Sequence, residues 1–117
     1  MALVWPIFAY GAGVAQGLIE SGIPVDRAPA LGTSAGSWVA SAIALGYGYD
    51  HFADMEAPSV PTRHPVLVEA ATEVIGDATH DLVSVSAVCL RSRRRHILDG
   101  GTYHLADLAA ASSAVPW

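Results

Sequence analysis

The five residues Gly32-Thr33-Ser34-Ala35-Gly36 constrain this chain more than any other feature, because of the segments on either side of them. A short apolar run, 28–31, precedes them, and an apolar pattern typical of a helix, 37–45, follows them. This is the strand, sharp turn and helix context in which a serine hydroxyl is presented as a nucleophile. We therefore predict that Ser34 is a nucleophile held at such a turn.

The neighbours of Ser34 have defined roles in a turn of this kind. Gly32 and Gly36 allow strained backbone angles and close contact between strand and helix, so a side chain at either position is expected to collide with the neighbouring element. The backbone amide of Ala35 and the dipole of the following helix could stabilise an oxyanion built on the serine. A glycine- and serine-rich turn without chemistry is the alternative, since 11 of the 117 residues are glycine.

Strand-like and helix-like patterns alternate along the whole chain. The predicted strands are 2–5, 28–31, 82–90 and 96–98, and the predicted helices are 13–21, 37–45, 65–75 and 104–111. Segment 47–63 is predicted to be a loop of the kind that covers a site, and 91–95 a turn. The alternation predicts one α/β domain over residues 1–117, with a mostly parallel sheet.

Composition narrows the function classes. With 52% hydrophobic and 15% charged residues, most of the chain must be buried, and a net charge of −5 gives no reason to expect nucleic acid as a partner. The arginines at 91 and 93–95 favour a solvated turn, with contact to phosphate or lipid headgroups as the alternative. Cys89 lies in an apolar run, which predicts a buried small side chain rather than a disulfide, a metal ligand or a reactive thiol.

Two uncharged stretches, 2–19 and 28–49, raise the alternative of a membrane hairpin. The second is long enough to cross a bilayer, and Gly32 and Gly36 have the spacing of a helix-packing motif. Against this, Pro6, Pro29 and several glycines interrupt both stretches. Because no basic region precedes the apolar start, a secretory signal is not supported, and a cytoplasmic location, with peripheral membrane contact as an option, is expected.

A nucleophilic serine needs a proton acceptor, and several residues are candidates. A Ser-Asp-His triad could be drawn from Ser34 through Asp77 or Asp99 to His104. Asp99 could instead act as a base directly, although Asp99-Gly100-Gly101 is better explained as a hairpin turn that leads into 102–104. No two histidines have a helical i, i+4 spacing, so no metal site is expected. The histidines are His51, His64, His80, His96 and His104.

Three segments in the same order resemble the patatin-like phospholipases, which are serine acyl hydrolases with a Ser-Asp dyad in a three-layer α/β/α fold. Residues 13–23 resemble the family's first helix, 32–36 its nucleophile turn, and 111–116 its Ala-Ser-x-Ala-x-Pro segment. The resemblance implies that Ser34 attacks the carbonyl of a lipid or other ester, that an aspartate accepts its proton, and that no cofactor takes part.

Two departures from the family change what is expected. The glycine-rich loop after the family's first strand, which supplies oxyanion amides, has no counterpart, because no glycine precedes Gly11 and Pro6 lacks an amide proton. The family's dyad aspartate follows the Ala-Ser-x-Ala-x-Pro segment, whereas Asp99 precedes it. The chain therefore resembles a shortened member, incomplete at the C-terminus.

Since one lost oxyanion donor costs ~3 kcal/mol of barrier, weak or absent activity is expected. Uncovered apolar surface and self-association are expected as well. A non-catalytic fragment that binds lipid or protein is the alternative.

Overall fold

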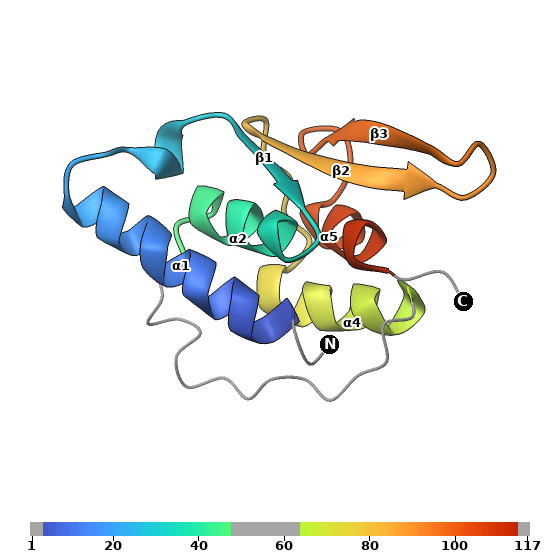
Figure 1. Ribbon diagram of the computed structural model, residues 1–117, viewed down its shortest axis with the longest axis horizontal. Coiled ribbons are helices and arrows are strands. Elements are labelled where there is room, and N and C mark those ends of the chain that lie inside the picture. The colour runs from blue at the N-terminus through green and yellow to red at the C-terminus, as the bar shows by residue number, and fades with distance from the viewer. Residues whose placement is uncertain (1–3, 48–63, 115–117) are drawn as a thin grey trace.

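The computed structural model describes residues 4–47 and 64–114 of the chain, which form helices and a small sheet (Figure 1). The predicted loop over 47–63 lies outside this part of the chain except for Tyr47. The combination of helices and a mixed sheet confirms the α/β class. In chain order the elements are α1 (Val4–Glu20), the 3₁₀ helix η1 (Val25–Arg27), β1 (Ala30–Thr33), α2 (Ala35–Ala44), α4 (His64–Ile75), β2 (Val83–Cys89), β3 (Arg94–Asp99) and α5 (Leu105–Ser113).

The three described strands form one sheet in the order β1-β2-β3. Strand β1 is parallel to β2, with Leu31 opposite Ser84, and β2 is antiparallel to β3, with Ser86 opposite Ile97. The expectation of a mostly parallel sheet is therefore wrong for these strands. The connection over 90–93 is too short for a parallel crossover and can only return the chain antiparallel.

Helices cover one face of this sheet. Helices α2 and α5 pack against the strands, while α1 packs on α2 and α4 packs mainly on α5. In Figure 1 the layers follow one another as sheet, helices, helices. The predicted α/β/α order, with helices on both faces, is not what the described part of the chain forms.

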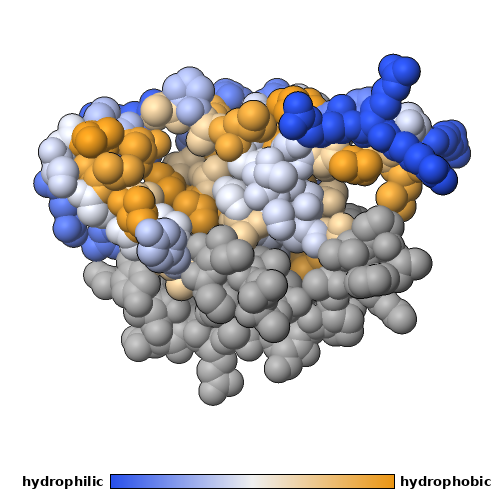
Figure 2. Space-filling view, viewed as in Figure 1, coloured by the Kyte–Doolittle hydropathy of each residue, from blue (hydrophilic) through white to orange (hydrophobic). Residues whose placement is uncertain are grey.

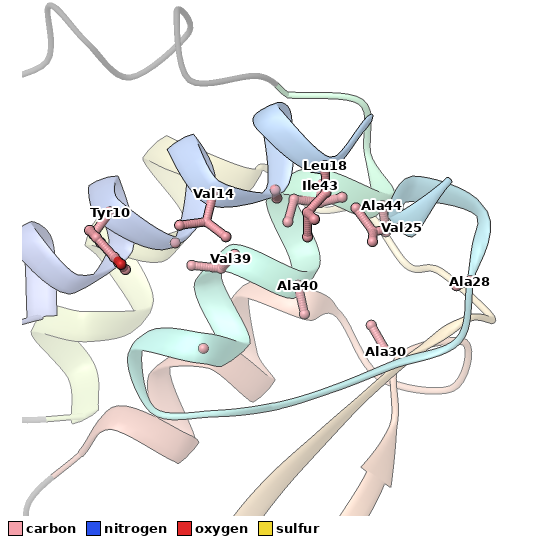
Figure 3. Close-up of a pocket in the computed structure, with 13 residues that line it drawn as sticks. Tyr10, Val14, Leu18, Val25, Ala28, Ala30, Val39, Ala40, Ile43 and Ala44 are labelled. Atoms are coloured by element: carbon pink, nitrogen blue, oxygen red, sulfur yellow. The ribbon is translucent and has the colours of Figure 1, made fainter. Parts of the chain in front are cut away.

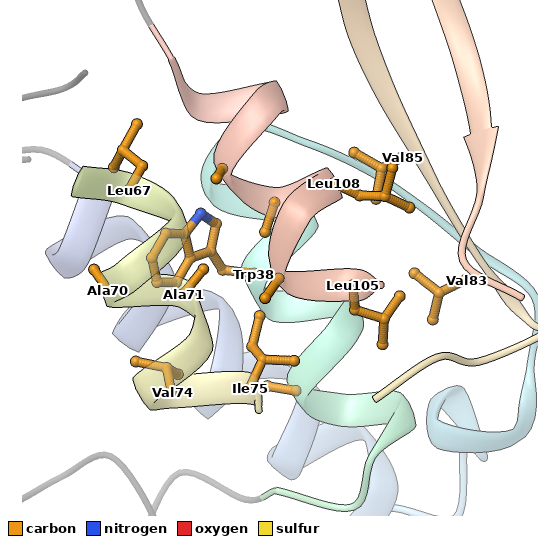
Figure 4. Close-up of a cluster of buried hydrophobic side chains, with 14 residues drawn as sticks. Trp38, Leu67, Ala70, Ala71, Val74, Ile75, Val83, Val85, Leu105 and Leu108 are labelled. Carbon is orange, nitrogen blue, oxygen red and sulfur yellow. The ribbon is translucent and has the colours of Figure 1, made fainter. Parts of the chain in front are cut away.

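The hydrophobic core lies between the sheet and the helices (Figure 4). The indole of Trp38 on α2 is fully buried and lies beside Leu67 and Ala71 of α4. Leu105 and Val83, both with 0% exposure, connect α5 to the sheet. Because alternate strand residues point to opposite faces, Leu31, Val88 and Ile97 share the other face. These three side chains are 62%, 61% and 53% exposed.

Helix α1 corrects the N-terminal prediction. Val4 and Trp5 belong to this helix, so the strand predicted over 2–5 is wrong for its described residues. Pro6 does not prevent the helix, because the first four amides of a helix have no acceptor within it. Gly11 lets α1 lie close to α2, since a Cβ at Gly11 would lie 2.8 Å from Cγ2 of Val39.

The segments around the central turn lie close to their predicted positions. Strand β1 is displaced by two residues from the predicted 28–31, and α2 begins at Ala35 rather than at Ser37. Only Ser34 therefore separates β1 from α2, so the turn is shorter than the five residues 32–36 suggested. Helix α2 ends at Ala44 with Leu45 as its C-cap, and Gly46, the predicted stop, follows with φ 82°. The amide of Tyr47 closes this end by donating to the carbonyl of Ala42 at 2.8 Å.

The β2–β3 hairpin differs from prediction in three ways. The turn occupies 90–93, so Arg94 and Arg95 belong to β3. Cys89 is exposed rather than buried, because the end of β2 extends past the helices into this hairpin. Residues 102–104 do not form a strand paired with β3 but lead into α5. A turn does follow Asp99, as predicted, but it connects β3 to helix α5 rather than to another strand.

Within the described residues, none of the helices has both the length and the apolar character required to cross a bilayer. The stretch 28–49, on which the membrane alternative depended, is divided between β1 and α2 in its described part.

Candidate functional site: the Ser34 turn

Ser34 lies at the junction of β1 and α2, with a backbone conformation that L-residues rarely adopt. Its φ is 54° and its ψ is −125°. Such a conformation costs about 1–3 kcal/mol and persists only where the surroundings fix it. Ser34 precedes the first residue of α2 and is half-buried, so the side chain is neither inside a helix nor sealed in the core.

The two glycines of the turn are not equivalent. A Cβ at Gly32 would lie 2.5 Å from the Cα of Ser37 and 2.6 Å from the carbonyl oxygen of Gly36. These are backbone atoms, which cannot move aside cheaply, so Gly32 is required for the close contact between β1 and α2. A Cβ at Gly36 would meet nothing within 4 Å. The expected collision is confirmed at Gly32 and is wrong at Gly36.

Hydrogen bonds hold both backbone polar groups of Ser34. Its amide donates to Oγ of Ser112 at 2.7 Å, and the Ser112 hydroxyl donates to the carbonyl oxygen of Ser86 at 2.6 Å. The carbonyl oxygen of Ser34 accepts from Oγ of Ser37 at 2.5 Å and from the amide of Ser37 at 2.9 Å. The turn is thus tied to α5, to β2 and to the first turn of α2.

The Ala-Ser-x-Ala-x-Pro resemblance pointed to residues 111–116, and the structure brings two of them to the turn. Oγ of Ser112 accepts a hydrogen bond from the Ser34 amide, and Oγ of Ser113 accepts a hydrogen bond from Nε1 of Trp38 at 2.9 Å. Both serines lie at the end of α5, which packs against α2 and β1. The resemblance located this segment, but no sequence signal identified its contact with Ser34.

The amide of Ala35 is placed as an oxyanion donor would be. Ala35 is the first residue of α2, and no described residue accepts a hydrogen bond from its amide. The positive end of the helix dipole lies at this position, which favours negative charge. That Ala35 stabilises an oxyanion stays a prediction.

Asp99 lies far from Ser34. It pairs with Ser84, level with Leu31, whereas Ser34 follows the other end of β1. Strand spacings place the two residues about 14 Å apart. The carboxylate is also engaged in its own turn, where it accepts from the amide of Gly101 at 3.0 Å and from Oγ1 of Thr102 at 3.1 Å. Asp99 is therefore a turn residue in this fold and not a base for Ser34.

The Ser-Asp-His triad is not assembled either. His104 caps the start of α5, eight residues before Ser112, which contacts Ser34. Eight helical residues span about 12 Å. Asp77 follows the end of α4, and its neighbour Ala78 accepts a hydrogen bond from the amide of Leu105 at 3.0 Å, which places Asp77 near the start of α5 rather than near Ser112. No described residue forms a hydrogen bond with Oγ of Ser34.

The remaining histidines do not change this result. Nδ1 of His80 accepts a hydrogen bond from the amide of Leu82 at 3.1 Å, and His96 is exposed on β3. The side chains of His51 and His64 lie outside the described part of the chain. Among the described residues no three His, Cys, Asp or Glu side chains are grouped as metal ligands would be.

An apolar groove of about 410 Å³ lies between α1 and α2 (Figure 3), and Gly36, two residues after Ser34, is among the residues that line it. Tyr10, Val14 and Leu18 line it from α1, and Val39 and Ile43 line it from α2. None of the described residues that line the groove is charged. A groove of this composition fits a hydrocarbon chain. Sequence reasoning missed it, because it depends on how the two helices pack.

Apolar and hydrophilic side chains gather in different places on the face of the molecule shown in Figure 2. Apolar side chains gather over the end of α1, at the left of the view, where Leu18, Ile19 and Ile23 are exposed. The β2–β3 hairpin lies at the right of this view, and its four arginines are exposed as expected, although only Arg91 and Arg93 lie in the turn itself.

Cys89 lies beside these arginines, at the end of β2. Hydrogen bonds from the backbone and then the side chain of Ser92, followed by the backbone of Arg91, lower the pKa of the Cys89 thiol from its ordinary value of 9.0. An exposed thiol with a lowered pKa is more reactive than the buried one that the sequence predicted.

Comparisons of the chain with protein-family models, with curated proteins and with solved structures find no match. We therefore infer its function from the geometry of the Ser34 turn and from the sequence motifs.

Proposed function

We propose that this chain is a serine acyl hydrolase of the patatin-like class, acting on carboxylic esters of lipids with Ser34 as its nucleophile. The observation that carries the proposal is the backbone of Ser34, at φ 54° and ψ −125° between a strand and a helix. A nucleophile turn needs such a conformation to expose a hydroxyl above the sheet. Strain of this kind clusters at functional sites.

The contact between the turn and the end of α5 supports the proposal. Two of the three segments that resemble the family, 32–36 and 111–116, are far apart in sequence and hydrogen bonded through Ser34 and Ser112. A turn without chemistry has no evident need for this long-range support.

The apolar groove between α1 and α2 favours a substrate ester with a long acyl chain. Gly36, in the first turn of α2, is among the residues that line the groove, so an acyl chain bound between α1 and α2 with its carboxyl end at Gly36 would present its ester near Ser34. The Ser34 hydroxyl would attack the ester carbonyl there, and the Ala35 amide would donate to the developing oxyanion. The alkoxide then leaves and takes a proton from solvent, and water hydrolyses the acyl-enzyme to release the carboxylic acid and restore the Ser34 hydroxyl.

The attack also requires a base to accept the Ser34 proton. The described residues offer no base bonded to Oγ of Ser34, and Asp99 is engaged in its own turn. General base assistance contributes 10²–10⁴-fold to such a step. We therefore expect slow acylation by activated reagents and weaker turnover of ordinary esters.

A fluorophosphonate probe tests the nucleophile without requiring turnover. Wild-type chain and Ser34→Ala are treated with the probe, and Ser92→Ala serves as a control that removes an exposed serine from the hairpin. Labelling of wild type and Ser92→Ala, but not of Ser34→Ala, supports the proposal. Equal labelling of all three, or of none, contradicts it.

The exposed apolar face of the sheet favours a second candidate, a non-catalytic domain that binds anionic lipid. Val88 and Ile97 are more than half exposed beside the basic hairpin. Apolar side chains flanked by arginines suit a membrane surface with anionic headgroups. Co-sedimentation with phosphatidylglycerol vesicles that is unchanged in Ser34→Ala, together with no probe labelling, would favour this candidate over the hydrolase.

A further inference from the structure

We infer that Ser112 is a positioning residue for Ser34: its hydroxyl holds the Ser34 backbone in the strained conformation that directs the nucleophile. The inference rests on the proposed function, and it gives the end of α5 a role beyond packing. Its basis is the chain of hydrogen bonds from the Ser34 amide to Oγ of Ser112 and from the Ser112 hydroxyl to the carbonyl oxygen of Ser86.

The geometry of a residue at positive φ explains why the amide matters. The direction of the Cα–Cβ bond of Ser34 is set by the two peptide planes that flank its Cα. Ser37 fixes the second plane by donating to the Ser34 carbonyl oxygen at 2.5 Å. Ser112 fixes the first plane by accepting from the Ser34 amide at 2.7 Å.

Without Ser112 the first peptide plane is free to rotate toward an ordinary negative φ. This rotation relieves the strain, so the strained state persists only while the hydrogen bond opposes it. Because β1 and α2 are both held in place by packing, part of the change in φ is taken up by ψ of Ser34, and the change in ψ turns the Cα–Cβ bond away from the Ala35 amide. Loss of Ser112 should therefore change the reactivity of Ser34 without direct contact with a substrate.

Ser113 provides a matched control within the same turn of α5. It is a serine at the end of the same helix, it is buried, and its Oγ accepts from Nε1 of Trp38 at 2.9 Å. It does not hydrogen bond to Ser34. Ser112→Ala and Ser113→Ala both remove a hydroxyl from α5, but only the first removes the partner of the Ser34 amide.

Two measurements on the folded chain separate positioning from stability. The first is hydrogen exchange of the Ser34 amide by NMR, normalised to the global stability of each variant from urea unfolding. The second is fluorophosphonate labelling resolved into the maximal rate, kinact, and the reagent affinity, KI. Ser112→Thr, which keeps a hydroxyl, is the rescue variant.

We expect Ser112→Ala to speed exchange of the Ser34 amide at least tenfold after normalisation. It should lower kinact by about tenfold to a hundredfold with KI unchanged, as for a misplaced reacting group. Ser113→Ala should change neither value, and Ser112→Thr should restore both toward wild type.

Equal effects of Ser112→Ala and Ser113→Ala, or normalised exchange of the Ser34 amide that does not respond to Ser112→Ala, would overturn the inference. If wild type is not labelled at all, the proposed function fails, yet the exchange experiment still decides whether Ser112 fixes the turn. If Ser112→Ala does not fold, slow exchange at Ser34 in Ser112→Thr supports the inference, and fast exchange there overturns it.

Discussion

Replacing Ser34 with glycine should stabilise the fold while abolishing its chemistry. The strain at φ 54° and ψ −125° costs about 1–3 kcal/mol for a residue with a Cβ, and glycine adopts the conformation freely. Glycine loses about 0.5–1 kcal/mol of this gain through the greater entropy of the unfolded chain. No hydrogen bond of the Ser34 side chain to a described residue is lost. We expect Ser34→Gly to be about 1 kcal/mol more stable than wild type, and Ser34→Ala, which keeps the strain, to lie within about 0.5 kcal/mol of it.

Equilibrium unfolding in urea, followed by tryptophan fluorescence, to which the buried Trp38 contributes, and by circular dichroism, measures these differences. A gap of about 1 kcal/mol corresponds to a change of roughly 3–5 °C in Tm for a chain of this size. His104 is the matched control, because it caps α5 at an ordinary φ of −64° without a side-chain capping bond. The same comparison of glycine with alanine at His104 should give a smaller gap. If Ser34→Gly is no more stable than Ser34→Ala, or if His104 shows an equal gap, the reasoning from strain is wrong.

Three further predictions concern the glycines of the Ser34 turn, the Cys89 thiol and the Asp99 carboxylate. Gly32→Ala should destabilise the chain by about 2 kcal/mol or more because the new Cβ meets backbone atoms, whereas Gly36→Ala should be neutral or stabilising by up to about 1 kcal/mol, and urea unfolding of the pair distinguishes them. The rate of Cys89 alkylation should rise with pH around a midpoint below 9.0, because the lowered pKa leaves more thiolate at any pH beneath that value, and Ser92→Ala should shift the midpoint upward. Asp99→Asn should leave probe labelling of Ser34 within about twofold of wild type, since its carboxylate lies in a distant turn, and a large loss of labelling would show that Asp99 serves the site after all.

Much of the local structure could be read from the sequence, because local signals determine it. Gly46 and Gly76 end their helices at positive φ, as their positions after apolar stripes suggested. The strand, turn and helix around Ser34 follow from a change in hydrophobic periodicity on either side of two glycines. The residues of the β2–β3 hairpin were recognisable as strand, turn and strand for the same reason.

The parts that the sequence did not predict depend on tertiary packing. The uncharged start of the chain fits a buried strand or a helix equally well, and α1 forms because its alanine and glycine residues pack against α2. Cys89 belongs to an apolar run, yet the projection of the hairpin beyond the helices exposes it. The side of the sheet that helices cover is set by the same packing, so the layer order could not be read from periodicity.

At the candidate site, the sequence indicated Ser34 and its neighbours but not the distant residues that hydrogen bond to the turn. The motif identified which serine to consider, and the collision expected at Gly32 follows from backbone geometry that the motif implies. The hydrogen bond from Ser34 to Ser112 joins residues 78 positions apart, and no local pattern encodes it. Likewise, only the pairing register of the three strands shows that Asp99 lies far from Ser34.

The central claim is that Ser34 is a nucleophile at a turn where the Ala35 amide meets developing negative charge. A crystal structure of the chain after reaction with a fluorophosphonate tests it most directly. We predict phosphorus bonded to Oγ of Ser34, with the phosphoryl oxygen about 3 Å from the amide nitrogen of Ala35. An adduct on another residue, or on Ser34 with its phosphoryl oxygen directed away from α2, would contradict the account.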